Sequence, residues 1–220
     1  MPSHAQSKNR TLGMDVSHYQ KDIDWPAVYA TGVRFVFCKA AEGTHHVDPL
    51  FDAHLEAAQA NSILPGSYHF FRAHKDPEQQ AQRYFDAAAH RSALPPVLDF
   101  ETLNGVSATE AIVRARRFIE ATEALWDRAC IVYTYPAFWN LLGQPEAPDM
   151  GERPLWIAHY TTHEPILPRP WKEWTFWQYD GTGGQVLPNG MDADFNWFNG
   201  SEVDLHDFQR STMPTLELTR

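Results

Sequence analysis

The stretch PPVLDFET, residues 95–102, ends an apolar run with two carboxylates, Asp99 and Glu101, that lie two positions apart. The run is typical of a buried strand, and side chains two apart in a strand point to the same face of a sheet. Asp99 and Glu101 are therefore expected on one face together with Val97, whereas Leu98 packs under a helix on the other face. Burying a charged group is costly unless it is paired, so the two acids mark a candidate functional site.

The segments around this strand alternate between apolar runs and stretches with helical spacing. Strands are expected within residues 12–19, 33–43, 63–73, 95–101 and 129–135. Each is followed by a predicted helix, within residues 24–32, 48–61, 76–90, 107–126 and 136–142. The strongest helix start is Ser107, because its spacing of three residues to Glu110 is that of a capping box.

The last third of the chain follows a different pattern. Three more strands are expected within residues 154–160, 174–180 and 192–198, and the linkers between them hold Pro, Gly and Thr. Five β/α units followed by three strands indicate an α/β fold, an irregular TIM-like barrel. We therefore expect a flexible N-terminal segment, a catalytic barrel domain and a C-terminal tail, at residues 1–10, 11–210 and 211–220.

The composition limits the classes of partner. The formal net charge is −10, and the sequence has no basic face of the kind that binds nucleic acid or anionic membranes. Aromatic residues reach 13% and include eight Trp, which favours a carbohydrate ligand because sugar rings stack on such side chains. The two cysteines, Cys38 and Cys130, lie in separate apolar runs and are expected to be buried thiols. No apolar run approaches the ~18 residues of a membrane span.

Further carboxylates lie at or near the ends of other predicted strands. Asp15 belongs to the first strand and Asp194 to the last, and Glu42, after the second, is a weaker candidate. Chemistry in such barrels gathers at the carboxyl ends of the strands, so these acids are expected to meet Asp99 and Glu101 in one pocket. Two close carboxylates cannot both ionise freely, so one pKa should rise. A protonated acid beside an anionic one is what glycosidic bond cleavage requires.

A structural alternative is that these acids cap helices or pair with cations such as Lys39 and Arg72. For a single Asp that alternative is the better interpretation. Four acids at successive strand ends, among the aromatic segments YHFF, VYTY, IAHY and FWQY, favour a functional pocket.

Seven sequence blocks, in order along residues 12–200, carry a resemblance to a known family. They are GMDVSHYQKDIDW (13–25), FVFCKAAEG (35–43), GSYHFFR (66–72), PPVLDFE (95–101), LWIAHY (155–160), FWQY (176–179) and DFNWFNG (194–200). On these blocks the chain resembles the glycoside hydrolase family 25 lysozymes, which are N-acetylmuramidases. The resemblance implies a barrel of five β/α units followed by three strands, in agreement with the pattern above.

The resemblance also implies an activity and a set of roles. The reaction is hydrolysis of the β-1,4 bond from N-acetylmuramic acid to N-acetylglucosamine in a peptidoglycan glycan strand. Glu101 matches the general acid/base, and Asp99 matches the partner that orients the substrate's acetamido group if the reaction runs by neighbouring-group participation. Asp15 and Asp194 match two further acids of the site. A direct carboxylate nucleophile stays open, and no metal or organic cofactor is implied.

The chain departs from the family pattern at two points. The last acid usually stands in a V-D-x-N pattern, but here Ala193 precedes Asp194, and Asp192 competes for the same role. The residue after Gln20 is usually Gly, and here it is Lys21. Neither change removes a carboxylate, so the expected activity is retained.

Polar and aromatic side chains in the same blocks are candidates for substrate binding. They are Tyr68, Tyr133, Tyr160, Trp177 and Gln178. Each of the aromatic residues also suits a core position. The histidines give no metal motif: His159 and His163 lie in strand and loop instead of one helix face, and the His45-His46 pair is expected to be solvated.

Two other functions remain open on the sequence. One is a different barrel glycosidase acting on a chitin-like polymer, although the residues before Asp99 lack the D-x-x-D-x-D-x-E run of such enzymes. The other is a catalytically silent module that binds cell walls. We expect a monomer that contacts the glycan strand and neither binds nucleic acid nor inserts into membranes. The start of the sequence lacks a recognisable signal peptide, so we expect synthesis in the cytoplasm and release to the wall by lysis or a dedicated secretion route.

Overall fold

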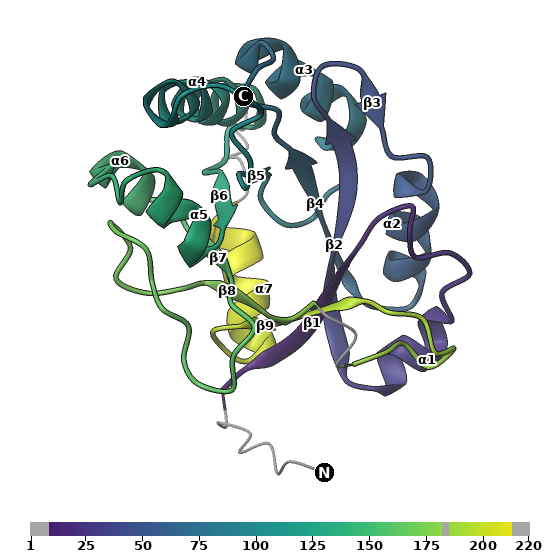
Figure 1. Cartoon of the computed structure of the whole chain (residues 1–220). Coiled ribbons are helices and arrows are strands. Elements are labelled where there is room, and N and C mark those ends of the chain that lie inside the picture. Colours follow the sequence, from purple (N-terminus) through teal and green to yellow (C-terminus); the bar gives the residue numbers. More distant parts are fainter. Residues whose placement is uncertain (1–8, 182–184, 213–220) are drawn as a thin grey trace, which may run out of the picture.

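The computed structural model describes residues 9–181 and 185–212, whose strands form one closed barrel (Figure 1). The barrel strands are β1 (Thr11–Val16), β2 (Val33–Glu42), β4 (Leu64–Phe70), β5 (Val97–Asp99), β6 (Ile131–Thr134), β7 (Leu155–Ala158), β8 (Phe176–Asp180) and β9 (Asp194–Phe198). Strand β1 pairs with both β2 and β9, which closes the ring. Strand β3 (His46–Val47) lies outside the ring and forms an antiparallel pair with the end of β2. The predicted irregular TIM-like barrel is confirmed.

Strand direction places the predicted acids. The neighbours from β1 to β8 along the ring are parallel, so their carboxyl ends lie at one end of the barrel. Strand β9 is antiparallel to both of its neighbours. Its first residue, Asp194, therefore lies at that same end and pairs with Asp15 in the β1–β9 register.

Helices follow the first five barrel strands, as the sequence predicts. They are α1 (Trp25–Ala30), α2 (Phe51–Ala60), α3 (Pro77–Ala88), α4 (Ala108–Trp126) and α5 (Pro136–Leu141). The side chain of Ser107 accepts a hydrogen bond from the backbone N–H of Glu110 and caps α4, which is one half of the predicted capping box. The Glu110 side chain pairs with Arg114 instead of completing the box. None of the helices in the described ranges combines the length and the apolar character needed to cross a membrane.

The sequence pattern does not predict β3, α6 (Pro148–Gly151) or α7 (Glu202–Ser211). Helix α7 covers the end of the barrel opposite the acids, because Leu205 is fully buried and Phe208 contacts the rings of Phe176 and Phe198. The helix runs to Ser211, one residue into the predicted tail. The rest of that tail from residue 213, and residues 1–8 of the predicted N-terminal segment, lie outside the described residues.

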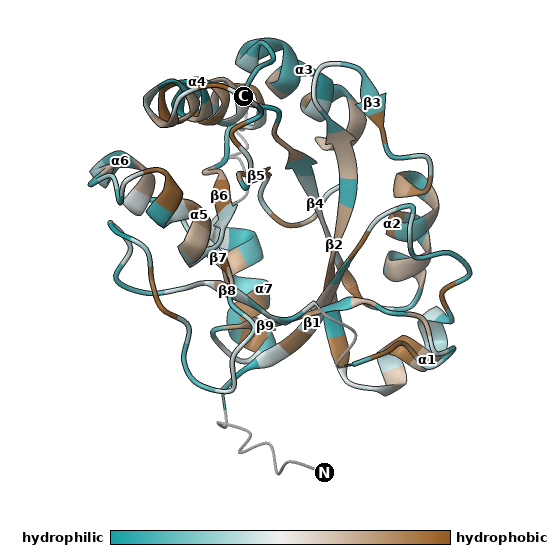
Figure 2. Ribbon diagram, in the orientation of Figure 1, coloured by the Kyte–Doolittle hydropathy of each residue, from teal (hydrophilic) through white to brown (hydrophobic). Residues whose placement is uncertain are grey.

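Alternate strand residues divide into two apolar layers. Val97 belongs to the cluster inside the barrel, whereas Leu98 belongs to the layer between strands and helices, as predicted. Figure 2 shows mostly hydrophobic strands surrounded by helices that carry both hydrophobic and hydrophilic residues. The interior is tightly filled: a Cβ on Gly66 would lie 2.5 Å from the Phe37 ring, so only glycine fits there. Cys38 and Cys130 are buried free thiols, as predicted.

Candidate active site

A cavity of about 300 Å³ opens at the end of the barrel where the parallel strands finish. The four acids predicted to meet, Asp15, Asp99, Glu101 and Asp194, all line it. Three are supplied by β1, β5 and β9, and Glu101 follows β5 by two residues. The i, i+2 spacing therefore directs Asp99 and Glu101 into the same space, as expected from the sequence.

Asp15 is buried beneath two amide donors. Its Oδ2 accepts hydrogen bonds from Asn196 Nδ2 at 2.7 Å and from Gln178 Nε2 at 2.8 Å. The Gln178 amide also donates to Asp194 Oδ2 at 3.3 Å. Burial, and then the charge of Asp194, raise the pKa of Asp15 well above its usual range, against the effect of the two amides.

The tyrosines of the pocket fix the direction of the Gln178 amide. Gln178 Oε1 accepts hydrogen bonds from the hydroxyls of Tyr133 at 3.0 Å and Tyr160 at 3.1 Å. The amide nitrogen is thereby left to donate to Asp15 and Asp194. Burial raises the pKa of Asp194 to about 6, with a further contribution from the charges of Asp180 and Asp192.

Asp99 is 5% exposed, and its Oδ1 has no hydrogen-bond partner among the described residues. Burial, followed by the charge of Glu101, raises the pKa of Asp99 well above its usual range, and Lys39 opposes the shift. A buried acceptor without a partner is costly, because it loses its hydrogen bonds to water. At the wall of a pocket, such an oxygen is available to a donor on a ligand.

Glu101 is half-buried and makes no ion pair with any residue of the described ranges. Burial raises its pKa, against the lowering effects of Lys39 and then Arg72, while the charge of Asp194 adds to the rise. The side chain thus combines access to the pocket with a tendency to retain its proton.

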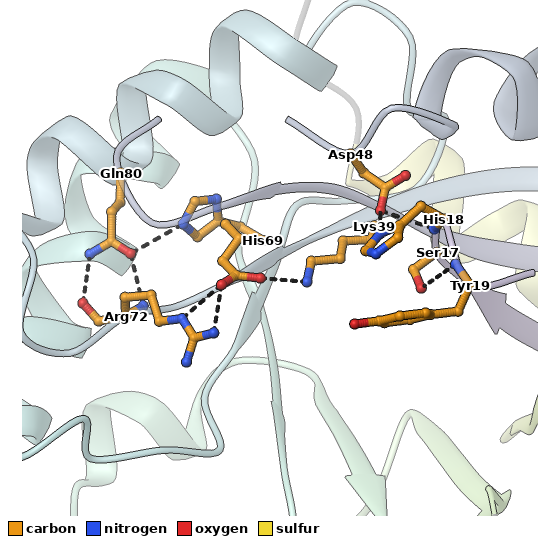
Figure 3. Close-up of polar contacts among 9 residues, drawn as sticks. Ser17, His18, Tyr19, Lys39, Asp48, His69, Arg72 and Gln80 are labelled. Atoms are coloured by element: carbon orange, nitrogen blue, oxygen red, sulfur yellow. Dashed lines mark hydrogen bonds and ion pairs between the residues drawn. The ribbon is translucent and has the colours of Figure 1, made fainter. Parts of the chain in front are cut away.

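The cations near these acids pair elsewhere. Lys39 Nζ lies 2.6 Å from Glu42 Oε2, and Arg72 Nη2 lies 2.5 Å from Glu42 Oε1 (Figure 3). Burial opposes ionisation of Glu42, but the hydrogen bonds from Lys39 and Arg72 hold its pKa below the usual value. The structural alternative, ion pairing of the predicted acids with these cations, is therefore wrong for Asp99 and Glu101. It holds for Glu42, which is not among the residues lining the cavity.

Of the predicted substrate-binding residues, Tyr68, Tyr133, Tyr160 and Gln178 line the cavity, and Trp177 does not. The strand alternation explains this correction, since Gln178 points into the barrel and its neighbour must point outward. The Trp177 indole packs against Trp174, and its Nε1 donates to the carbonyl of His159. Trp177 is therefore a residue of the outer apolar layer.

Asp194, and not Asp192, faces the cavity. The backbone carbonyl of Asp192 accepts a hydrogen bond from Gln20 Nε2 at 3.2 Å. Strand β9 begins at Asp194, and this position brings Asp194 to the cavity in place of Asp192.

Among the lining residues that the sequence does not predict, Tyr19 and Lys39 matter most for the site. Tyr19 lies three residues after the end of β1 and is 75% exposed, so its ring stands at the rim of the cavity. Its place after a strand end, inside the block GMDVSHYQ, was the available signal. The sequence indicates Lys39 only as a possible partner for an acid, because the pattern of β2 does not tell which of its polar residues face the barrel interior.

Comparison with known proteins agrees with this geometry. The family model of glycosyl hydrolases family 25 matches residues 14–186. The chain belongs to this family. Lysozyme M1 of Streptomyces globisporus is 33% identical to this family 25 chain over 204 residues, which are 88% of the chain and 69% of that protein.

Solved structures of a lysozyme and a muramidase share the fold. The bacterial lysozyme of Streptomyces coelicolor is 32% identical and superposes with a TM-score of 0.83, covering 92% of this chain and 98% of that one. The muramidase of Trichobolus zukalii is 29% identical with a TM-score of 0.81, covering 92% and 100%. The protein is a glycoside hydrolase of the lysozyme and muramidase type.

Proposed function

We propose that this family 25 enzyme cleaves the β-1,4 bond between N-acetylmuramic acid and N-acetylglucosamine in peptidoglycan, with retention of configuration and participation of the substrate's acetamido group. The observation that carries the proposal is the pair Asp99 and Glu101. Both line one cavity. Asp99 is nearly enclosed and its Oδ1 has no hydrogen-bond partner in the described part of the chain, whereas Glu101 is open to the pocket. Similarity to a lysozyme and to a muramidase supports peptidoglycan as the substrate.

Glu101 is assigned the acid/base role. It donates its proton to the glycosidic oxygen as the bond from C1 to that oxygen breaks. The carbonyl oxygen of the acetamido group meanwhile forms a bond to C1 from the opposite side. Glu101, now a carboxylate, then takes a proton from a water that attacks C1, and the bond from C1 to the acetamido oxygen breaks. Two inversions at C1 give net retention.

Asp99 is assigned the stabilising role. Its Oδ1 accepts a hydrogen bond from the acetamido N–H. At a pH above its raised pKa, the negative charge of Asp99 offsets the positive charge that spreads over the acetamido group. Asp15 is less suited to act as a direct nucleophile, because its Oδ2 already accepts two amide hydrogen bonds. This difference favours acetamido participation over a carboxylate nucleophile.

The decisive experiment is mass spectrometry of the muropeptides released from purified cell walls, together with NMR of the first anomer formed. N-acetylmuramic acid at the new reducing end, released as the β-anomer, is the expected result. N-acetylglucosamine at the reducing end, or faster release of sugars from chitin, would assign the enzyme to the alternative glycosidase class. Tight wall binding with no soluble product would instead identify the silent binding module.

A further inference from the structure

Three side chains from two separated parts of the chain converge beside the rim of the active-site cavity. His18 follows β1, His46 lies in β3, and Asp48 follows β3 directly. Each offers a ligand atom, and these atoms all lie within 4.8 Å of one another. We call this group the His18–His46–Asp48 cluster. It belongs to neither the four acids nor the lining of the cavity.

Asp48 is the fixed member of the cluster. Its side chain is fully buried, and the backbone N–H groups of His18 and Leu50 donate to its two oxygens at 3.0 Å. His18 Nδ1 lies 2.7 Å from Asp48 Oδ2, a contact visible in Figure 3. A buried carboxylate held in place by backbone donors is a preorganised anionic ligand, because it needs no reorganisation to receive a cation.

The two histidines supply access from solvent. The His18 side chain is 30% exposed and His46 is exposed, and their rings stand nearly perpendicular with centroids 6.2 Å apart. His46 is carried on a two-residue strand at the edge of the sheet, so its ring is free to turn toward its neighbours. The cluster is thus closed on the carboxylate side and open on the imidazole side.

We propose that His18, His46 and Asp48 form a binding site for a divalent transition-metal ion, with Zn²⁺ as the best match. Two imidazoles and one carboxylate, with water as the fourth ligand, form a donor set that suits tetrahedral Zn²⁺. The hard ions Mg²⁺ and Ca²⁺ prefer oxygen ligands and fit this set poorly. The metal replaces the proton between His18 Nδ1 and Asp48 Oδ2, and that proton moves to His18 Nε2 or to solvent.

The site bears on the cavity through one aromatic contact. The His18 ring lies against the Tyr19 ring, with centroids 4.2 Å apart, and Tyr19 lines the cavity. A metal on His18 therefore fixes the ring on which the exposed Tyr19 rests. The cluster shares no residue with the four acids of the cavity.

The test is calorimetric titration of Zn²⁺ into untagged protein in a buffer that does not chelate metals. Wild type should bind one equivalent, and an excess of Mg²⁺ should not compete. His46→Ala should weaken Zn²⁺ binding at least ~10-fold. Loss of a residue that only supports a metal ligand already lowers metal affinity by about that factor. His45→Ala is the matched control and should bind as wild type does, because His45 is the exposed neighbour outside the cluster.

A second measurement follows the histidine ring signals by NMR during the same titration. The signals of His18 and His46 should shift, while those of His90 and His206 stay in place. Absence of binding at millimolar Zn²⁺ would overturn the proposal. Equal affinity of the His46→Ala and wild-type proteins, or shifts confined to other histidines, would do the same by locating the metal elsewhere.

Discussion

Glu101 differs from its partner Asp99 in access. Glu101 is half-buried at the cavity, whereas Asp99 is enclosed and lies beside it on the same face of one strand end. The sequence predicts this pair because the spacing of two residues in a strand fixes a shared face. The sequence does not predict that Lys39 and Arg72 bind Glu42, since that contact depends on how β2 and β4 are aligned.

Glu101→Gln keeps the shape of the side chain and removes its exchangeable proton. Clearing of cell-wall suspensions should slow at least ~10²-fold, because a positioned acid/base group accelerates such a reaction by about that factor. The circular dichroism spectrum should be unchanged. Glu120→Gln is the matched control, the same change at an exposed position outside the cavity lining, and should clear walls at the wild-type rate. Clearing by Glu101→Gln at a near wild-type rate would remove Glu101 from the acid/base role.

Lys39→Met tests the electrostatics of the pair. Lys39 lowers the pKa values of both Asp99 and Glu101, so its loss should raise both. Because Asp99 acts ionised and Glu101 acts protonated, both limbs of the profile of kcat/KM against pH should move to higher pH. Lys21→Met, the same change at an exposed site, should leave the profile in place. An unmoved profile in Lys39→Met would show that this lysine does not set the protonation of the pair.

Among the elements, β8 and β9 show where pattern reading succeeds and where it fails. Both strands are predicted, but the pattern does not reveal that β9 runs antiparallel to its neighbours. It also does not tell which of Trp177 and Gln178 faces inward, because both faces of a buried barrel strand are covered. The contacts of β8 with its neighbours decide this, and they place the amide inside.

The sequence pattern also does not predict helix α7, because its apolar face is weakly marked. Its sequence is mostly polar, and Leu205 is its buried residue, so an apolar stripe is missing. A start signal was nevertheless present, since Ser201 and Asp204 form a complete capping box.

Arg128 ties this helix to the barrel. Its guanidinium donates to the carbonyls of Thr212, Leu94 and Ala93 at 2.6, 3.2 and 3.1 Å, and the residue is 8% exposed. Arg128→Met should lower the free energy of unfolding by at least about 2 kcal/mol, because these charge-assisted hydrogen bonds are lost and buried carbonyls stay unpaired. Urea denaturation measures the change.

The wall-clearing rate of Arg128→Met at 25 °C should stay near wild type, since α7 lies at the end of the barrel opposite the acids. Arg169→Met is a suitable control, because Arg169 forms an exposed ion pair whose loss should change stability by less than about 1 kcal/mol. Equal stability of the two variants would contradict the anchoring role of Arg128.

For the molecule as a whole, gathering four acids in one cavity links stability to pH. The pKa of Asp194 is about 6 in the folded protein, above the usual Asp value of 3.8. A raised pKa means that the folded state holds the proton more tightly, so this contribution is present below about pH 4 and is lost as pH rises through 6. Buried His69 titrates in the opposite sense, because burial lowers its pKa to about 3.

A comparison of variants isolates the Asp194 contribution from that of His69. Asp194→Asn should melt at least about 2 °C above wild type at pH 7.5, a shift that roughly 1 kcal/mol produces in a domain of this size. The difference should be smaller at pH 4.5, where most of the contribution of Asp194 is present. Thermal unfolding followed by circular dichroism at the two pH values gives the difference. The same melting difference at both pH values would show that ionisation of Asp194 does not strain the fold.

The reversed direction of β9 has a consequence for how such an enzyme can diversify. Strand β8 finishes, and β9 begins, at the catalytic end, so both ends of the connection between them lie there, whereas each β/α crossover links opposite ends of the barrel. Residues can be gained or lost in that connection without changing the order or register of the barrel strands. A segment with both ends at the mouth of the cavity is therefore a place where changes of sequence can alter glycan selectivity while the acids keep their positions.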